Sequence, residues 1–105
     1  MDMNIGQLHA NATTATALLK VLANESRLQI LCQLIDGEKS VNELEQLVGL
    51  RQSALSQHLA ILRRERLVKT RREAQFIHYS LVSSEAKAII ETLYSLYCAP
   101  RKKKA

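Results

Sequence analysis

Four short polar side chains recur along one side of the segment from Arg51 to Arg64. The amides of Gln and the hydroxyls of Ser both donate and accept hydrogen bonds, as contacts to base edges in the DNA major groove require. Leucines at i, i+4 and i+7 place an apolar stripe on the opposite side of the same helix. An apolar back with an amide-rich front is typical of a DNA-recognition helix. The polar positions are Gln52, Ser53, Ser56 and Gln57, and the apolar positions are Leu55, Leu59 and Leu62.

Basic residues are concentrated in the same part of the chain. The formal net charge is +5 over 105 residues, yet residues 1–50 carry three basic and six acidic groups, whereas residues 51–72 carry seven basic groups and one acidic group. Such a basic region attracts the phosphate backbone of a nucleic acid. The alternative, a solvated surface on an ordinary domain, predicts charge spread along the chain. Because the chain has no Trp and only 4% aromatic residues, we expect double-stranded DNA as the partner, not stacked single strands.

The other groups capable of chemistry are the two thiols, Cys32 and Cys98. The N-terminus lacks the apolar stretch of a secretory signal, and no apolar run is long enough to span a membrane. We therefore expect a cytoplasmic protein without membrane partners, whose thiols stay reduced. Free cysteine is commonly a small buried hydrophobe, and Cys32 falls on the apolar stripe of its predicted helix. A reactive thiol is the alternative, and the residues alone leave both open.

Caps and periodicity predict the elements that position these groups. Asn24 is a suitable N-cap, and Ser40 and Glu43 have the spacing of a capping box. Gly49 supplies a short turn before the recognition segment, and a helix, a Gly-containing turn and a second helix form the helix-turn-helix layout. The predicted helices cover residues 8–22, 25–36, 40–48 and 51–64.

Two β-strands are predicted next. Thr, Val, Tyr, Phe and Ile are enriched over residues 67–72 and 76–81, with residues 73–75 forming the tip between them. A β-hairpin after a helix-turn-helix is a wing. Arg71, Arg72 and Gln75 lie near its tip, where they can reach a phosphate or a minor groove.

A last helix is predicted from Ser83 or Ser84 to Cys98, because Pro100 stops it. The basic residues 100–105 are expected to be a disordered tail. The expected architecture is therefore one winged helix-turn-helix domain over residues 1–99, mainly α with a small β-hairpin, in the order ααααββα.

Several segments together resemble the ArsR/SmtB family of bacterial winged-helix repressors. They are the sequence ANESRLQIL at residues 23–31, the sequence SALSQHL at residues 53–59, and the basic wing, and the resemblance extends over residues 12–98. It implies a homodimer paired through the first and last helices. Such a dimer binds a palindromic operator in double-stranded DNA, with one recognition helix in each half-site.

Other residues of the recognition segment have less specific roles. Arg51 stands where many members of the family carry a Ser N-cap, so we expect it to contact phosphate instead. His58 is expected either to pack or to contact phosphate. Arg63 and Arg64 either complement the helix dipole or contact DNA, and the sequence favours neither.

Many family members sense metals, but the resemblance does not extend to their ligands. Residues 40–42 read Ser-Val-Asn where a metal-sensing member has Cys-x-Cys, and residues 83–99 contain no His or Asp. His9, His58 and His78 fall in different elements. A zinc site needs three or four well-placed ligands, so we expect no metal and no cofactor.

The cysteine positions resemble those of the sulfide-responsive branch of the family, the BigR and SqrR type, and of the related HlyU regulators. That branch carries one Cys on the second helix and one near the end of the last, as do Cys32 and Cys98. The resemblance implies that low-molecular-weight persulfides link the two thiols through extra sulfur atoms, and that the repressor then leaves the operator of sulfide-detoxification genes. Thiolate exchange supports the chemistry. A bridge of three or four sulfurs spans a longer gap than a disulfide, whose Cα atoms usually lie about 4.4–6.8 Å apart.

Three alternative functions differ in the residues that they require. A HlyU-like regulator would antagonise another repressor, raise virulence gene expression and respond to peroxide. A thiol enzyme is not expected, because no His or carboxylate is recognisably placed beside either cysteine. A winged-helix module for protein interaction alone would not require the amide-rich front or the basic region.

Overall fold

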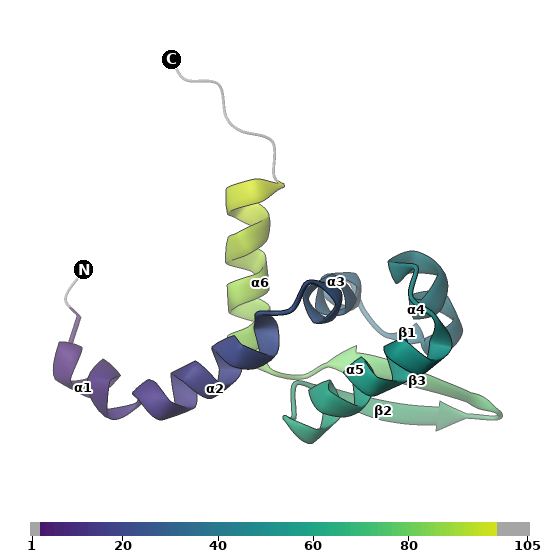
Figure 1. The fold of residues 1–105 in the computed structure, drawn as a ribbon, viewed down its shortest axis with the longest axis horizontal. Helices are drawn as coiled ribbons and strands as arrows, with labels where there is room; N and C mark the ends of the chain where they lie inside the picture. The colour runs from purple at the N-terminus through teal and green to yellow at the C-terminus, as the bar shows by residue number, and fades with distance from the viewer. Residues whose placement is uncertain (1–2, 99–105) are drawn as a thin grey trace, which may run out of the picture.

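The computed structural model describes residues 3–98, and within them it contains six helices and three short strands (Figure 1). The expected class, a mainly helical winged helix-turn-helix, is confirmed, with one helix and one strand more than predicted. The predicted tail at residues 100–105 lies outside the described residues. The elements are α1 (Ile5–Ala10), α2 (Ala12–Leu22), α3 (Glu25–Leu34), β1 (Lys39–Ser40), α4 (Val41–Val48), α5 (Gln52–Arg64), β2 (Val68–Glu73), β3 (Phe76–Leu81) and α6 (Ser84–Tyr97).

The prediction of one helix over residues 8–22 is wrong. Asn11, with φ −101° and ψ 12°, separates α1 from α2, and its side-chain amide donates to the Gln7 carbonyl at 3.0 Å. The Asn11 backbone N–H donates to the same carbonyl at 3.2 Å, so Asn11 closes the end of α1 with both its backbone and its side chain. Apolar periodicity could not reveal the break, because Leu8 and Ala12 stand four residues apart on either side of it.

The helix-turn-helix forms as its caps predict. The Asn24 side chain accepts from the Arg27 N–H at 3.0 Å, and both bonds of the Ser40–Glu43 capping box are present. Gly49 ends α4 in the left-handed region at φ +78°, which a residue with a side chain adopts at a cost. These local signals fix where α3 and α4 begin and where the chain turns into α5.

The sheet has three antiparallel strands in the order β1-β3-β2, and β1 is a strand that the sequence did not predict. It is two residues long, and its pairs are Lys39 with Tyr79 and Ser40 with His78. The hairpin tip is a two-residue turn with Ala74 at φ +56°, so Glu73 pairs directly with Phe76. The wing is therefore anchored through β1 to the start of α4.

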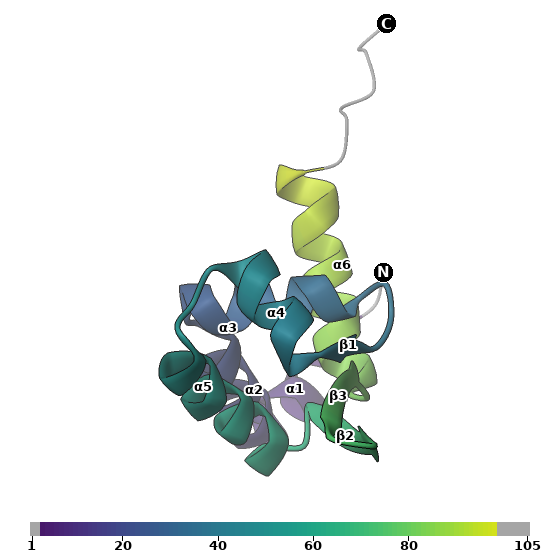
Figure 2. The same cartoon turned by 90° about the vertical axis from the view of Figure 1, so that its right-hand side faces the viewer.

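Buried side chains from α2, α3, α4, α5, β2 and α6 form one core, and Figure 2 shows these elements arranged around a common centre. Leu55, Leu59 and Leu62 of α5 are at most 1% exposed, as the apolar stripe predicted. Each fully buried leucine contributes about 1.5–3 kcal/mol. On α6 only Ala86 and Ile90 are buried. Its C-terminal half projects from the body (Figure 1), which leaves apolar side chains uncovered within the chain.

Candidate DNA interface and thiol pair

A groove runs between the exposed side of α5 and the wing. From α5 it is lined by Gln52, Ser56, Arg63 and Arg64, and from the wing by residues that include Gln75, Phe76 and Ile77. The start of α4 lines it as well. Four of the residues expected to contact DNA, Gln52, Ser56, Arg64 and Gln75, thus come together in one groove from two elements.

The remaining polar residues of α5 lie outside this groove. Ser53 and Gln57 are exposed on the helix surface. Arg51 occupies the N-cap position of α5, and its side chain forms no capping hydrogen bond. Arg51 is exposed at the helix N-terminus, which favours a nearby anion.

His58 is half-buried and faces the body of the protein. Its Nδ1 lies 3.5 Å from Nη1 of Arg27 on α3. The same guanidinium donates from Nε to the Val21 carbonyl at the end of α2, at 2.7 Å. Of the two roles expected for His58, this geometry supports packing. Arg27, which the sequence analysis did not single out, brings α2, α3 and α5 together.

The two wing arginines lie on opposite faces of the hairpin, because residues alternate along a strand. Arg72 pairs with Ile77, a residue of the groove, whereas Arg71 pairs with His78. Directly paired residues share a face. Arg72 therefore lies on the groove face, and among the described residues it forms no ion pair within 4 Å.

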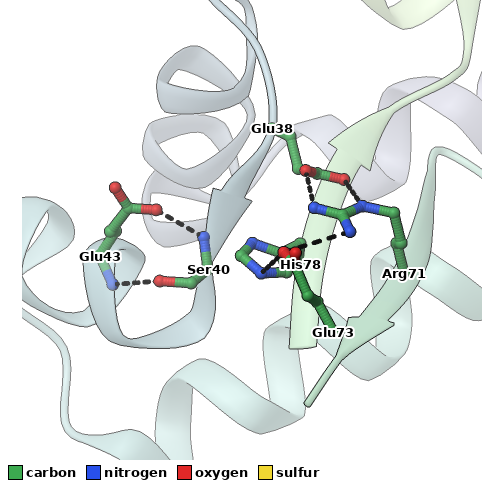
Figure 3. A network of polar contacts seen from close by, with 6 residues as sticks. All are labelled: Glu38, Ser40, Glu43, Arg71, Glu73 and His78. Carbon is green, nitrogen blue, oxygen red and sulfur yellow. Dashed lines mark hydrogen bonds and ion pairs between the residues drawn. The ribbon is translucent and has the colours of Figure 1, made fainter. Parts of the chain in front are cut away.

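Arg71 is held by acidic side chains on the other face (Figure 3). Its Nη2 and Nε donate to the two carboxylate oxygens of Glu38 at 2.7 and 3.0 Å, and its Nη1 donates to Glu73 at 3.3 Å. The hydrogen bond with Glu38 raises the pKa of Arg71, and the same bond lowers the pKa of Glu38. Glu38 was missed by sequence reasoning, since 33 residues separate it from Arg71 and no local pattern connects them.

The capping box of α4 lies beside this ion-pair cluster (Figure 3). The hydrogen bond from the Ser40 backbone N–H lowers the pKa of Glu43, and the bond between the Glu43 N–H and the Ser40 hydroxyl closes the box. On the facing strand, Nε2 of His78 lies 3.7 Å from Glu73. Acidic and basic groups of the wing, the α3–β1 loop and α4 therefore form one surface cluster.

The structure brings the two cysteines to one hollow between α3 and α6. Cys32 and Cys98 both line it, together with Ile35, Asp36, Ile90, Glu91, Tyr94 and Ser95. Both are free thiols on exposed residues, which contradicts the interpretation of Cys32 as a buried hydrophobe. Partial desolvation in the hollow, and then the nearby Cys98, raise the pKa of the Cys32 thiol. The hollow therefore keeps Cys32 accessible to a reagent while disfavouring its thiolate form.

Two kinds of site are absent from residues 3–98. No group of three or more His, Cys, Asp or Glu side chains there is arranged to hold a metal ion. None of the helices in that range has both the length and the apolar character to cross a membrane.

Known proteins with similar sequences are regulators of transcription. Residues 24–70 match the family model described as bacterial regulatory protein, arsR family. The transcriptional activator HlyU of Vibrio cholerae is 57% identical over 91% of this chain and 89% of its own length. The biofilm growth-associated repressor of Agrobacterium fabrum is 45% identical over 94% of this chain and 85% of its own.

Solved structures agree with this assignment. Reduced HlyU from Vibrio cholerae superposes with a TM-score of 0.84, at 57% identity, over 89% of this chain and 98% of that one. The transcriptional repressor BigR from Xylella fastidiosa superposes with a TM-score of 0.88, at 39% identity, over 93% of this chain and all of that one. The relatives are named as transcription regulators, not as enzymes. With its helix-turn-helix, its wing and these relatives, the chain belongs to the ArsR family of DNA-binding transcription regulators.

Proposed function

We propose that this protein is a dithiol-switched repressor that binds operator DNA when reduced and releases it when Cys32 and Cys98 become linked. The observation that carries this proposal is the hollow between α3 and α6, which both thiols line although 66 positions separate them in sequence. A pair of free, accessible thiols in one hollow is suited to capture and then resolve a sulfur electrophile.

The DNA-binding part of the proposal is supported by where the polar and basic side chains gather. Gln52 and Ser56 of α5 lie in one groove with Arg64 and with Gln75 of the wing. We assign base contacts to the glutamine and serine side chains of α5, including Ser53 and Gln57, and phosphate contacts to Arg51, Arg64 and Arg72.

We further propose a two-fold homodimer in the cytoplasm, paired through α2 and α6. Leu19 of α2 is 53% exposed, and Tyr94, Leu96 and Tyr97 of α6 are 57%, 60% and 81% exposed. Large apolar side chains left exposed along two helices often mark an interface. A two-fold dimer would place one α5 in each half of a palindromic operator.

The chemistry begins when a thiolate attacks the sulfane sulfur of a low-molecular-weight persulfide, RSSH. The cysteine becomes a persulfide, CysSSH, and the donor leaves as RSH. If both cysteines are converted, the two persulfides condense to a trisulfide that joins Cys32 and Cys98, and the fourth sulfur leaves as hydrogen sulfide. The persulfide donor is the oxidant, so no other co-reactant is needed.

The link would act on DNA binding through α3. Cys32 is on α3, which contacts α4, α5 and α6. Fixing α3 to the end of α6 therefore changes how the helix-turn-helix sits on the dimer helices, a two-state displacement driven by a covalent bond. A hundredfold loss of operator affinity requires only about 2.8 kcal/mol.

The test is intact mass and DNA binding after separate treatment with glutathione persulfide, hydrogen peroxide and glutathione disulfide. We expect an internal link with added sulfur only with persulfide, together with release of the operator. The Cys32→Ser and Cys98→Ser variants should bind DNA when untreated and stay bound after persulfide. A treated wild-type protein that carries no link, or that carries one and still binds, contradicts the proposal.

A second candidate is a HlyU-like regulator that opposes another repressor and so raises the expression of virulence genes. The chain is 57% identical to the transcriptional activator HlyU and 45% identical to the biofilm growth-associated repressor, and this difference favours the second candidate. A plain disulfide formed with hydrogen peroxide, combined with displacement of a second DNA-binding protein from a shared promoter, would support this candidate against the first.

A further inference from the structure

The wing is attached to the body by an ion pair that crosses the sheet. Because β3 lies between β1 and β2, the bond from Arg71 on β2 to Glu38 just before β1 joins the two outer strands over the central one. Figure 3 shows the guanidinium facing the Glu38 carboxylate, with both oxygens engaged. A bidentate pair of this kind fixes direction as well as distance.

This pair connects the wing to the helix-turn-helix. Glu38 stands two residues before Ser40, which pairs with β3 and also caps α4. A two-stranded hairpin alone is marginally stable and free to twist. The pair, with Glu73 as a second partner of Arg71 at 3.3 Å, therefore restrains the angle between the wing and α4.

We propose that Glu38 and Arg71 are positioning residues for DNA binding, and that Arg71 orients the wing instead of binding a phosphate itself. The inference rests on the proposed DNA-binding function. It follows from the two faces of β2: Arg71 is engaged on the face with His78, while Arg72 is presented on the groove face. The wing tip reaches DNA at the correct angle only while the Glu38–Arg71 pair is closed.

The experiment uses Glu38→Asp and Arg71→Lys, which keep both charges but lose the bidentate geometry. Each should weaken duplex binding about fivefold, the equivalent of about 1 kcal/mol. The dependence of affinity on salt should not change, because no phosphate contact is removed. The double variant should lose no more than either single variant, since both break the same pair. Amide hydrogen exchange in β2 and β3 should become faster.

Two controls make the comparison specific. Glu25→Asp is an equally conservative change at an exposed position outside the pair, and it should leave binding unchanged. Unfolding of Glu38→Asp should resemble that of the wild type, because exposed ion pairs contribute little to stability.

Glu38→Gln separates the two roles by the sign of its effect. If Arg71 orients the wing, Glu38→Gln weakens binding. If Arg71 is a phosphate ligand restrained by Glu38, the same change frees it, so that affinity rises and the salt dependence steepens, which would overturn the inference. If every variant binds duplex DNA as tightly as the wild type does, the inference is overturned and the proposed function is left intact. If the wild type shows no salt-sensitive duplex binding, both the inference and the proposed function are refuted.

Discussion

Arg72→Ala and Gln57→Ala remove two different kinds of proposed DNA contact, and the structure predicts different consequences for each. Arg72 lies on the groove face of β2, whereas Gln57 is exposed on α5. One phosphate contact contributes about 0.9 to the slope of log affinity against log salt concentration. Since a dimer carries the change twice, Arg72→Ala should flatten that slope by about 1.8.

Gln57→Ala should leave the slope unchanged and reduce sequence discrimination. A bidentate contact to a base is worth about 1–3 kcal/mol against the wrong base, which is roughly fivefold to 150-fold. The loss should appear on the operator and nearly vanish on random duplex. Arg72→Ala should instead weaken both duplexes to a similar degree.

The assay is fluorescence anisotropy with an operator duplex, selected from random sequences, and a scrambled duplex of equal length, over a series of salt concentrations. Lys69→Ala is the matched control, because it removes the same charge from the same strand on the face away from the groove. Its slope should change by less than half as much. Equal flattening by Lys69→Ala and Arg72→Ala would refute the assignment of faces, and equal weakening of both duplexes by Gln57→Ala would refute base recognition.

Leu59→Ala should lower the free energy of unfolding by about 2–5 kcal/mol, since the side chain is 1% exposed in the core, and a urea titration that shows less than half the lower figure would contradict this. Gly49→Ala should lower the free energy of unfolding by about 1–2 kcal/mol in the same titration, because φ is +78°. No heavy atom lies within 4 Å of the added Cβ, so this cost is backbone strain and Gly49→Asn should cost less. Equal costs for the two variants would point to packing instead. The iodoacetamide reaction of Cys32 in the native protein should have its pH midpoint above that of the unfolded chain, because the pKa of the thiol is raised. Since the folded state favours the protonated thiol, this contribution to stability is present below the unfolded pKa and is lost as pH rises through the folded one; Cys98→Ser should lower the midpoint, and a native midpoint at or below the unfolded one would exclude the raised pKa.

Features coded by residues near one another in sequence were predicted, and features made by distant residues were not. Asn24, the Ser40–Glu43 box and Gly49 each act within one turn, so the helix-turn-helix followed from spacing alone. The two-residue strand β1 exists only because β3 lies beside it, and no periodic pattern can indicate it.

The same distinction applies to the sites. The amide-rich side of α5 was predicted from helical spacing, because the apolar side had to face the core. Glu38 reaches Arg71 only because the folded sheet brings the two residues together across β3. The sequence alone therefore predicted the same role, contact with DNA, for both wing arginines. The exposure of Cys32 depends on what α6 leaves uncovered, and periodicity along its own helix grouped it with residues of the apolar stripe.

The thiol hollow includes the end of α6 that projects away from α5 and the wing (Figure 1). A persulfide and an operator therefore approach different surfaces, and neither has to leave before the other arrives. If closing the link weakens operator binding by some factor, thermodynamic reciprocity requires the operator to oppose closure of the link by the same factor. At equilibrium, molecules away from the operator would then be linked at lower persulfide concentrations than operator-bound molecules. The size of the unbound pool would therefore set how much persulfide a cell must accumulate before its genes respond.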